Sequence, residues 1–111
     1  MPITRKANTG EQRLLDALVN RATTLTLSPN WKDALLVQTM DDGGMGSILL
    51  FPNGWSERKR LLGSVASKLE FRDEDGVDVL VSLNVDKEGE LFEVDVWKVD
   101  FSPLIRIPEE I

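Results

Sequence analysis

The sequence has no cysteine, no histidine and no tyrosine among its 111 residues. Without thiols there are no disulfides and no thiolate nucleophiles, and without imidazoles there are no Ser-His or Cys-His catalytic systems and no histidine-based metal sites. Carboxylates and lysines are the proton carriers that remain, so most types of nucleophilic catalysis are excluded. The lack of cysteine also fits a reducing compartment, and we expect a cytoplasmic protein.

Long apolar runs are lacking as well. No stretch reaches the roughly 18 apolar residues that suggest a membrane helix, and the amino end leads into polar sequence without an apolar export signal. We therefore expect no membrane anchor. With 41% hydrophobic and 29% charged residues the chain can bury a core, and its length predicts a single domain over residues 1–111.

Positive charge is scarce in the second half of the chain. Residues 1–60 carry eight Lys or Arg and six Asp or Glu, whereas residues 61–111 carry five and thirteen, within a net charge of −6. Such a field repels phosphate backbones and anionic membranes and favours encounter with basic partners. We expect a basic protein partner, no direct nucleic-acid ligand and no membrane contact. The basic triplet at 58–60 lacks stacking aromatics in a known motif and is interpreted as a solvated loop.

The first element that the pattern predicts is a helix over about residues 10–22. Thr9 is a suitable N-cap, Gln12 completes a capping box with it, and apolar residues recur on one helical face. That face holds Leu14, Leu15, Leu18, Val19 and Ala22. Two strand-like runs, at 34–40 and 47–51, flank a glycine-rich segment that suits positive φ angles, so we expect a hairpin there.

The carboxyl half alternates with a period of two residues, which is typical of half-buried strands. One strand is predicted over 65–72 and the next over 77–85. A three-residue loop that ends in a left-handed Gly76 places Phe71 opposite Val79, and the apolar faces of both strands then coincide. A slip by one residue would bury charged side chains against valines and is disfavoured.

The second turn, at 86–89, decides the register of the last strand. A three-residue loop would point Glu93 and Asp95 toward the apolar face. A four-residue loop avoids this and sets Leu83 opposite Phe92. We expect the inner face to bury Val79, Val81, Leu83, Phe92, Val94 and Val96. The predicted fold is α+β, an antiparallel meander of about five strands with the N-terminal helix packed on one face.

The outer face of this sheet is the candidate binding surface. The register places Trp97 there beside Leu80 and Leu91, among charged side chains. An apolar centre with a charged rim is typical of interaction patches. The candidate binding residues are Asp78, Leu80, Glu93, Asp95 and Trp97. The alternative is that the segment 52–63, predicted as a loop or short helix, or the C-terminal tail covers Trp97.

Other motifs give weaker signals. Glu93 and Asp95 are same-face carboxylates, but with nineteen acidic residues such pairs arise by chance, so we expect no catalytic residue. The segment 84–95 approaches a calcium-loop pattern, but it ends in Asp where a bidentate Glu is required, and it shows strand periodicity where helices are required. The turn at 43–46 lacks the helix start that would help it bind an anion. We expect no metal and no cofactor.

Four segments of the chain stand out together, MDDGGMGS at 40–47, DGV at 75–77, SLNVDKEG at 82–89 and WKVDFSPL at 97–104. With these segments the chain resembles a family of small bacterial proteins of unknown function, over most of its length. The resemblance implies a bacterial single-domain protein. It transfers no catalytic residue, because the family carries no assigned activity.

We therefore expect a non-enzymatic protein-interaction module whose acidic sheet face binds a basic partner, for example as an immunity-like or antitoxin-like inhibitor. Two alternatives come from other classes. One is a small-ligand-binding protein or carboxylate-based enzyme with a cleft beside the turn at 41–47, and the other is a structural subunit that buries the same face in a homodimer. A flat, exposed face favours the module, whereas a deep enclosed pocket with two carboxylates favours the enzyme.

Overall fold

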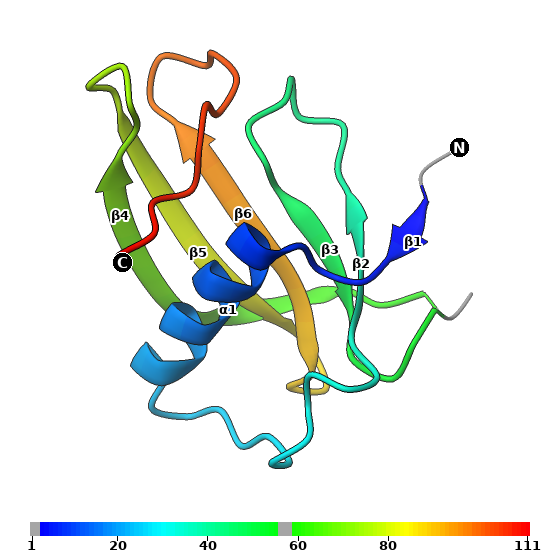
Figure 1. The fold of residues 1–111 in the computed structure, drawn as a ribbon. Helices are drawn as coiled ribbons and strands as arrows, with labels where there is room; N and C mark the ends of the chain where they lie inside the picture. Colours follow the sequence, from blue (N-terminus) through cyan, green and yellow to red (C-terminus); the bar gives the residue numbers. More distant parts are fainter. Residues whose placement is uncertain (1–2, 56–58) are drawn as a thin grey trace.

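The computed structural model describes residues 3–55 and 59–111. It contains one helix, α1 (Thr9–Arg21), and six strands. The strands are β1 (Thr4–Arg5), β2 (Leu36–Thr39), β3 (Ile48–Phe51), β4 (Leu62–Arg72), β5 (Asp78–Asp86) and β6 (Leu91–Lys98). They form one antiparallel sheet in the order β1-β2-β3-β6-β5-β4 (Figure 1). Among the described residues, no helix has the length and apolar character that a membrane crossing needs.

The α+β class and the N-terminal helix are confirmed, but the topology differs from the simple meander that the sequence predicts. β1 to β3 and β4 to β6 form two three-stranded meanders, which meet where β3 pairs with β6. After β3 the chain crosses to the far edge of the sheet, where β4 lies (Figure 1). The strand missing from the prediction is β1, which has two residues and is too short to show a periodic pattern.

The N-terminus of α1 lies one residue earlier than predicted. Its N-cap is Asn8, whose side chain accepts a hydrogen bond from the Glu11 amide at 2.8 Å, while the Glu11 carboxylate accepts one from the Asn8 amide at 2.9 Å. The predicted capping box of Thr9 and Gln12 is therefore wrong by one position. Asn is at least as good an N-cap as Thr, and the ion pair between Arg5 and Glu11, at 2.6 Å, favours the observed frame.

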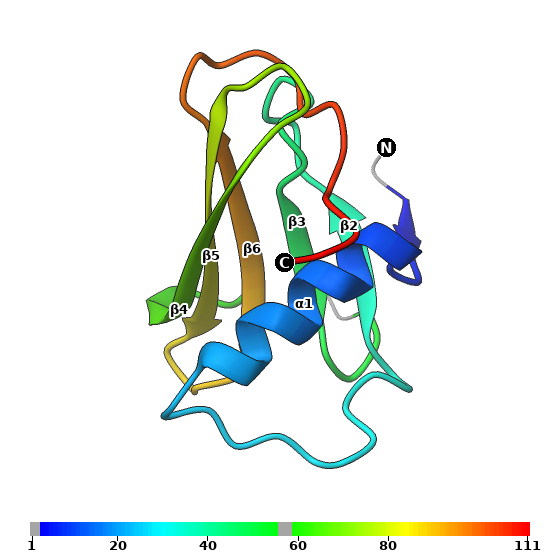
Figure 2. The same cartoon turned by 60° about the vertical axis from the view of Figure 1, so that its left-hand side comes forward.

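α1 and the C-terminal tail cover the same, inner face of the sheet (Figure 2). The apolar stripe of the helix is buried against the strands through Leu14, Leu15 and Leu18. Leu104 and Ile107 of the tail pack on the same core. The Arg13 guanidinium donates to the backbone carbonyl of Ile107 at 3.2 Å, which fastens the tail to the helix. Within residues 3–55 and 59–111, no helix covers the outer face of the sheet (Figure 2).

The predicted register between β4 and β5 is confirmed. Phe71 pairs with Val79, and Leu69 pairs with Val81. In the loop between the strands Gly76 has a φ of +81°, a conformation that costs a glycine little and other residues more. The apolar residues of both strands therefore share the inner face, as the alternation indicates.

The register between β5 and β6 differs from the prediction by two residues. Leu83 pairs with Val94, where the sequence analysis predicts Phe92. The turn is closed by the hydrogen bond from the Asp86 amide to the Glu90 carbonyl at 2.9 Å, so its loop has three residues and not the predicted four. The four-residue loop was predicted because it points Glu93 and Asp95 outward. Both side chains do point outward, but for a different structural reason.

A β-bulge at Phe92 restores the alternation of faces after the short loop. Val85 pairs with Leu91 and the residue before Val85 pairs with Glu93, which leaves Phe92 unpaired. Leu91 is consequently buried in the core, not on the outer face as predicted, and Phe92 is half-buried instead of lying in the apolar core. Glu93 and Asp95 remain on the outer face, where the prediction placed them.

Candidate interaction surface

Two rows of side chains cross the outer face of β4, β5 and β6. In the first row Glu70, Leu80 and Trp97 lie opposite one another on the three strands. The neighbouring row holds Lys68, Ser82 and Asp95. Because successive side chains of a strand point to opposite faces, both rows face away from the core valines that alternate with them.

The two rows line a hollow with a volume of about 360 Å³, together with Leu69 and Val81. Trp97 is 42% exposed and Leu80 is 36% exposed. The charged residues of the two rows are exposed as well. The hollow is therefore open to solvent and combines an apolar centre with charged sides.

The C-terminal tail adds a second aromatic ring beside this hollow. The ring centroids of Trp97 and Phe101 lie 6.0 Å apart with an angle of 53° between the planes. Phe101 is 69% exposed, and its φ of 64° lies in the left-handed region that residues other than glycine rarely adopt. Backbone strain of this kind persists where neighbouring contacts impose it. The tail thus holds an apolar ring in solvent at the side of Trp97.

Only part of the predicted site is brought together. Leu80, Asp95 and Trp97 line the hollow, but Asp78 and Glu93 do not. Asp78 lies at the end of β5, 3.5 Å from the guanidinium of its neighbour on β4. Glu93 is half-buried and accepts a hydrogen bond from a side-chain amide of β5 at 2.9 Å.

The two predicted coverings of Trp97 have different outcomes. The tail supplies the Phe101 ring and otherwise packs on the inner face, so it leaves much of Trp97 exposed. Within the segment 52–63, positions 56–58 lie outside the described residues. No described residue of this segment lines the hollow.

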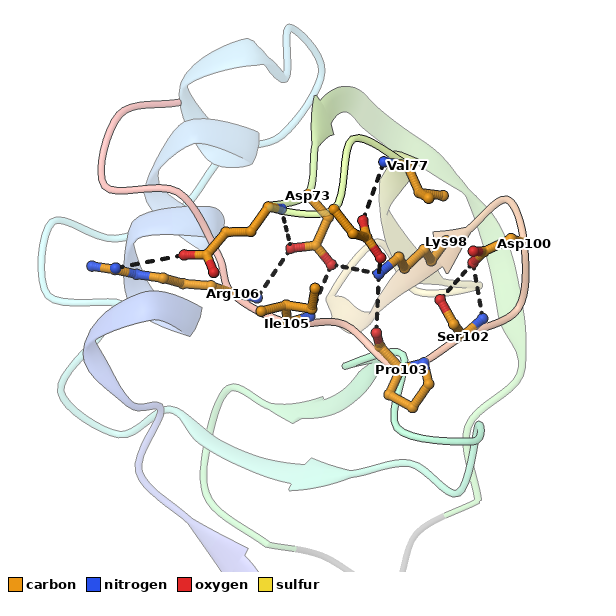
Figure 3. Close-up of polar contacts among 10 residues, drawn as sticks. Asp73, Val77, Lys98, Asp100, Ser102, Pro103, Ile105 and Arg106 are labelled. Carbon is orange, nitrogen blue, oxygen red and sulfur yellow. Dashed lines mark hydrogen bonds and ion pairs between the residues drawn. The ribbon is translucent and has the colours of Figure 1, made fainter.

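A buried ion pair on the inner side of β6 holds the tail in place (Figure 3). The Lys98 side chain is 1% exposed, and its Nζ donates to Asp73 Oδ2 at 2.9 Å, to Asp75 Oδ2 at 2.6 Å and to the Pro103 carbonyl at 3.2 Å. Asp73 also accepts a hydrogen bond from the Ile105 amide at 2.8 Å. The tail is thereby bonded to both partners of the ion pair, directly after the turn that presents Phe101.

The hydrogen bonds of this network control the ionisation of its members. Burial by itself would raise the pKa of Asp73, but hydrogen bonds from the Ile105 amide, the Lys98 ammonium and neighbouring amides outweigh it and lower the pKa to about 2. Burial would likewise lower the pKa of Lys98, but the hydrogen bonds to Asp75 and Asp73 raise it above its ordinary value. Both groups are charged near neutral pH, so the anchor is intact there.

A second group of acidic residues lies at the turn between β5 and β6. Carboxylate oxygens of Asp86, Glu88 and Glu90 lie within 4.8 Å of one another. Oδ1 of Asp86 accepts the amides of Glu88 and Glu90 at 2.9 and 3.0 Å, and Oδ2 lies 3.6 Å from a guanidinium nitrogen of Arg60. Glu88 and Glu90 have interactions of their own as well. Three positions of the calcium-like segment 84–95 thus lie close together, and Asp95 is not among them. The guanidinium of Arg60 lies beside Asp86.

Arg60 is held beside the buried Asp86 by contacts with two aromatic rings and a backbone carbonyl. Its guanidinium lies 5.4 Å from the ring centroid of Phe51 and 5.0 Å from that of Phe92, and it donates to the Leu91 carbonyl at 2.9 Å. These contacts fix the cation between β3 and the bulge of β6. The arrangement is typical of a structural ion pair that closes a sheet end, since guanidinium groups suit stacking and buried pairing.

The chain matches a known protein family by its sequence. A family model described as a domain of unknown function, DUF6984, matches residues 4–108. The chain belongs to this family. The match spans the helix, all six strands and most of the tail, and it confirms the family resemblance noted from the sequence. No curated protein and no solved structure matches the chain.

The family description assigns no activity, so the evidence for function comes from the outer face of β4, β5 and β6. The alternation of residues 65–72 predicts that Lys68 and Glu70 lie on the outer face, but it does not predict the position of Phe101. The segment that follows β6 does contain a sequence signal for the turn at Phe101. Asp100 accepts hydrogen bonds from the amide and the hydroxyl of Ser102, at 3.0 and 2.6 Å, which is a turn that the Asp-x-Ser spacing indicates.

Proposed function

We propose that this DUF6984 domain is a non-enzymatic protein-interaction module that binds a basic partner through its outer sheet face. The observation that carries the proposal is the open hollow with Trp97 and Leu80 at its centre. We call the surface formed by Trp97, Leu80, Glu70, Asp95 and Phe101 the Trp97 face.

The apolar part of the Trp97 face supports binding to a protein. Trp97, Leu80 and Phe101 are 42%, 36% and 69% exposed, and they cluster where a partner would remove them from water together. Tryptophan is among the residues that contribute most at interfaces, and truncating a central one commonly costs about 2 kcal/mol or more of binding free energy. Tryptophan also has only two side-chain torsion angles, which limits the entropy lost on binding.

The charged part of the surface supports a basic partner. Glu70 and Asp95 lie on either side of the apolar centre, and Lys68 is the single basic side chain among the described residues that line the hollow. A partner Arg or Lys placed over the Trp97 ring would gain a cation–π contact and would have carboxylates nearby. The acidic second half of the chain would speed the encounter with such a partner.

The carboxylate-based enzyme receives less support from this geometry. Glu70 and Asp95 line the hollow, but both are exposed, so water has free access to them. Glu93, the other member of the pair considered from the sequence, is bonded to Asn84 and lies outside the hollow. Acid and base catalysis by paired carboxylates needs environments that separate their pKa values, which an open surface provides poorly.

Affinity capture with matched variants tests the proposal. Wild-type protein, Trp97→Ala and Trp55→Ala serve as baits in a lysate of the source organism, followed by mass spectrometry of the retained proteins. Trp55 is a suitable control because it is a 54% exposed tryptophan outside the Trp97 face. We expect one basic protein to be retained by wild type and by Trp55→Ala and to be lost with Trp97→Ala. Retention of the same proteins by all three baits would contradict the proposal.

A further inference from the structure

The outer strand β4 presents a long free edge. β4 is the longest strand, with 11 residues, and it stands at the end of the strand order. In the part of the chain that the structure describes, β5 is its only strand partner, and its other edge faces away from the sheet (Figure 1). A free edge of this length offers unpaired backbone N–H and C=O groups to another strand.

The register shows which backbone groups point outward. The Asp73 amide donates to the Val77 carbonyl at 2.9 Å, so this pair is bonded across to β5. In an antiparallel pair, bonded and non-bonded positions alternate. Lys68, Glu70 and Arg72 therefore direct their N–H and C=O groups to the free edge. The register shifts lie before residue 67, so the stretch 67–72 is regular enough to accept a further strand.

We propose that this edge pairs antiparallel with the same edge of a second copy of the chain, with Lys68 opposite the partner's Glu70 and Leu69 on the twofold axis. Charge complementarity favours this register. By symmetry the pair of Lys68 and Glu70 forms twice. Both side chains are exposed, and the backbone N–H and C=O groups of both residues point to the free edge.

The two registers centred on the residues that flank Leu69 are disfavoured by their charges. A shift of the axis by one residue to Glu70 sets Glu70 against its own copy and Lys68 against Arg72, all like-charged pairs. A shift to Lys68 sets Lys68 against its own copy. Like charges directly opposite each other destabilise strand pairing. Lysine on an edge strand ordinarily discourages association, but here the second copy provides the matching carboxylate at the position the lysine faces.

The edge-to-edge dimer does not depend on the proposed partner, but it determines how two copies of the Trp97 face are arranged. A twofold axis perpendicular to the sheet joins two six-stranded sheets edge to edge, with both outer faces on the same side. Two Trp97 faces would then be presented together. A partner with repeated basic segments could engage both and gain avidity.

Charge reversal with rescue tests the register. Sedimentation equilibrium over a concentration series is measured for wild type, Lys68→Glu, Glu70→Lys and the double swap K68E/E70K, with Lys87→Glu as a control in an exposed turn of the same chain. We expect a dimer for wild type and for the control, and a dissociation constant raised about tenfold or more by each single reversal, because two attractive pairs become repulsive. The double swap should restore the wild-type constant to within about threefold.

Circular dichroism of each variant establishes that losses of dimer are not losses of fold. A monomer at every concentration would overturn the proposal, because the edge would then be free or reserved for a foreign strand. A dimer that the single reversals leave unchanged would equally overturn it. Neither result bears on the capture experiment with Trp97→Ala, so the two proposals fail separately.

Discussion

The Nζ of Lys98 lies 2.9 Å from Oδ2 of Asp73, with both side chains buried. Lys98 follows Trp97 on β6, so the two side chains point to opposite faces of the sheet. The same strand therefore anchors the tail on its inner side and presents the candidate interaction surface on its outer side. A buried pair of this kind is costly to break because one partner would be left as an uncompensated charge.

The anchor predicts a dependence of stability on acid pH. In the folded chain the pKa of Asp73 is lowered from 3.8 to about 2. The ionised group therefore stabilises the folded state above about pH 4, and this contribution is lost as the pH falls through the range from about 4 to about 2. We expect urea unfolding to show a steeper loss of stability in this range for wild type than for Asp73→Asn. As a control, Asp41→Asn removes an exposed carboxylate and should keep the wild-type slope; equal slopes for all three proteins would contradict the account.

Core packing on the inner face predicts a contrast between two valines. Val81 is 2% exposed and lies in the core, whereas Val65 on β4 is 50% exposed. Val81→Ala should lower the free energy of unfolding by about 1–3 kcal/mol, somewhat less than for larger core side chains. Val65→Ala should change it by less than about 0.5 kcal/mol. Denaturant unfolding of both variants checks this, and a negligible effect at Val81 would show that its side chain is not core.

The strained conformation of Phe101 predicts separate effects on stability and on the Trp97 face. Phe101→Gly removes a side chain from a φ of 64°, which glycine adopts without strain, so the fold should be as stable or up to about 1 kcal/mol more stable. Trp97 should become more exposed, with its fluorescence shifted to longer wavelength, because the ring 6.0 Å away is lost. Marked destabilisation together with unchanged emission would show that Phe101 packs in another way.

The turn between β5 and β6 is expected not to bind calcium tightly. Asp86 uses one oxygen on two turn amides and holds the other near Arg60, and a bound cation would have to compete with both. A calcium titration by calorimetry should give heats of dilution only. Binding in the micromolar range would contradict this, and Glu88→Gln would then show whether the three clustered carboxylates are responsible.

Those parts of the fold that depend on local alternation of apolar and polar residues could be predicted from the sequence. The pairing of Phe71 with Val79 followed from the period of two and a glycine at the turn. The pairing of Leu83 with Val94 did not, because a bulge at Phe92 absorbs one residue and leaves no mark in the alternation of charges. A register shift of two residues preserves the faces, so Trp97 and Asp95 point outward as predicted, although each pairs two positions further along β5 than the predicted register gives.

Contacts between residues that are far apart in the sequence could not be predicted from the alternation of apolar and polar residues. The burial of Lys98 depends on Asp73 and on a tail that folds back, and a lone lysine at the end of a strand is usually solvated. Asp78 and Glu93 were also assigned to the site, but each lies next to a polar side chain of the neighbouring strand and neither lines the hollow. The path from β3 to the far edge likewise has no local signature in the sequence.

The central claim is that the Trp97 face binds a basic protein, and the dissociation rate of the captured partner tests it most directly. We expect Trp97→Ala to release the partner at least about tenfold faster than wild type, and Trp55→Ala to release it at the wild-type rate. Asp95→Lys should mainly slow association and weaken its dependence on salt. If folded Trp97→Ala releases the partner at the wild-type rate, the exposed tryptophan is not part of the interface and the account is contradicted.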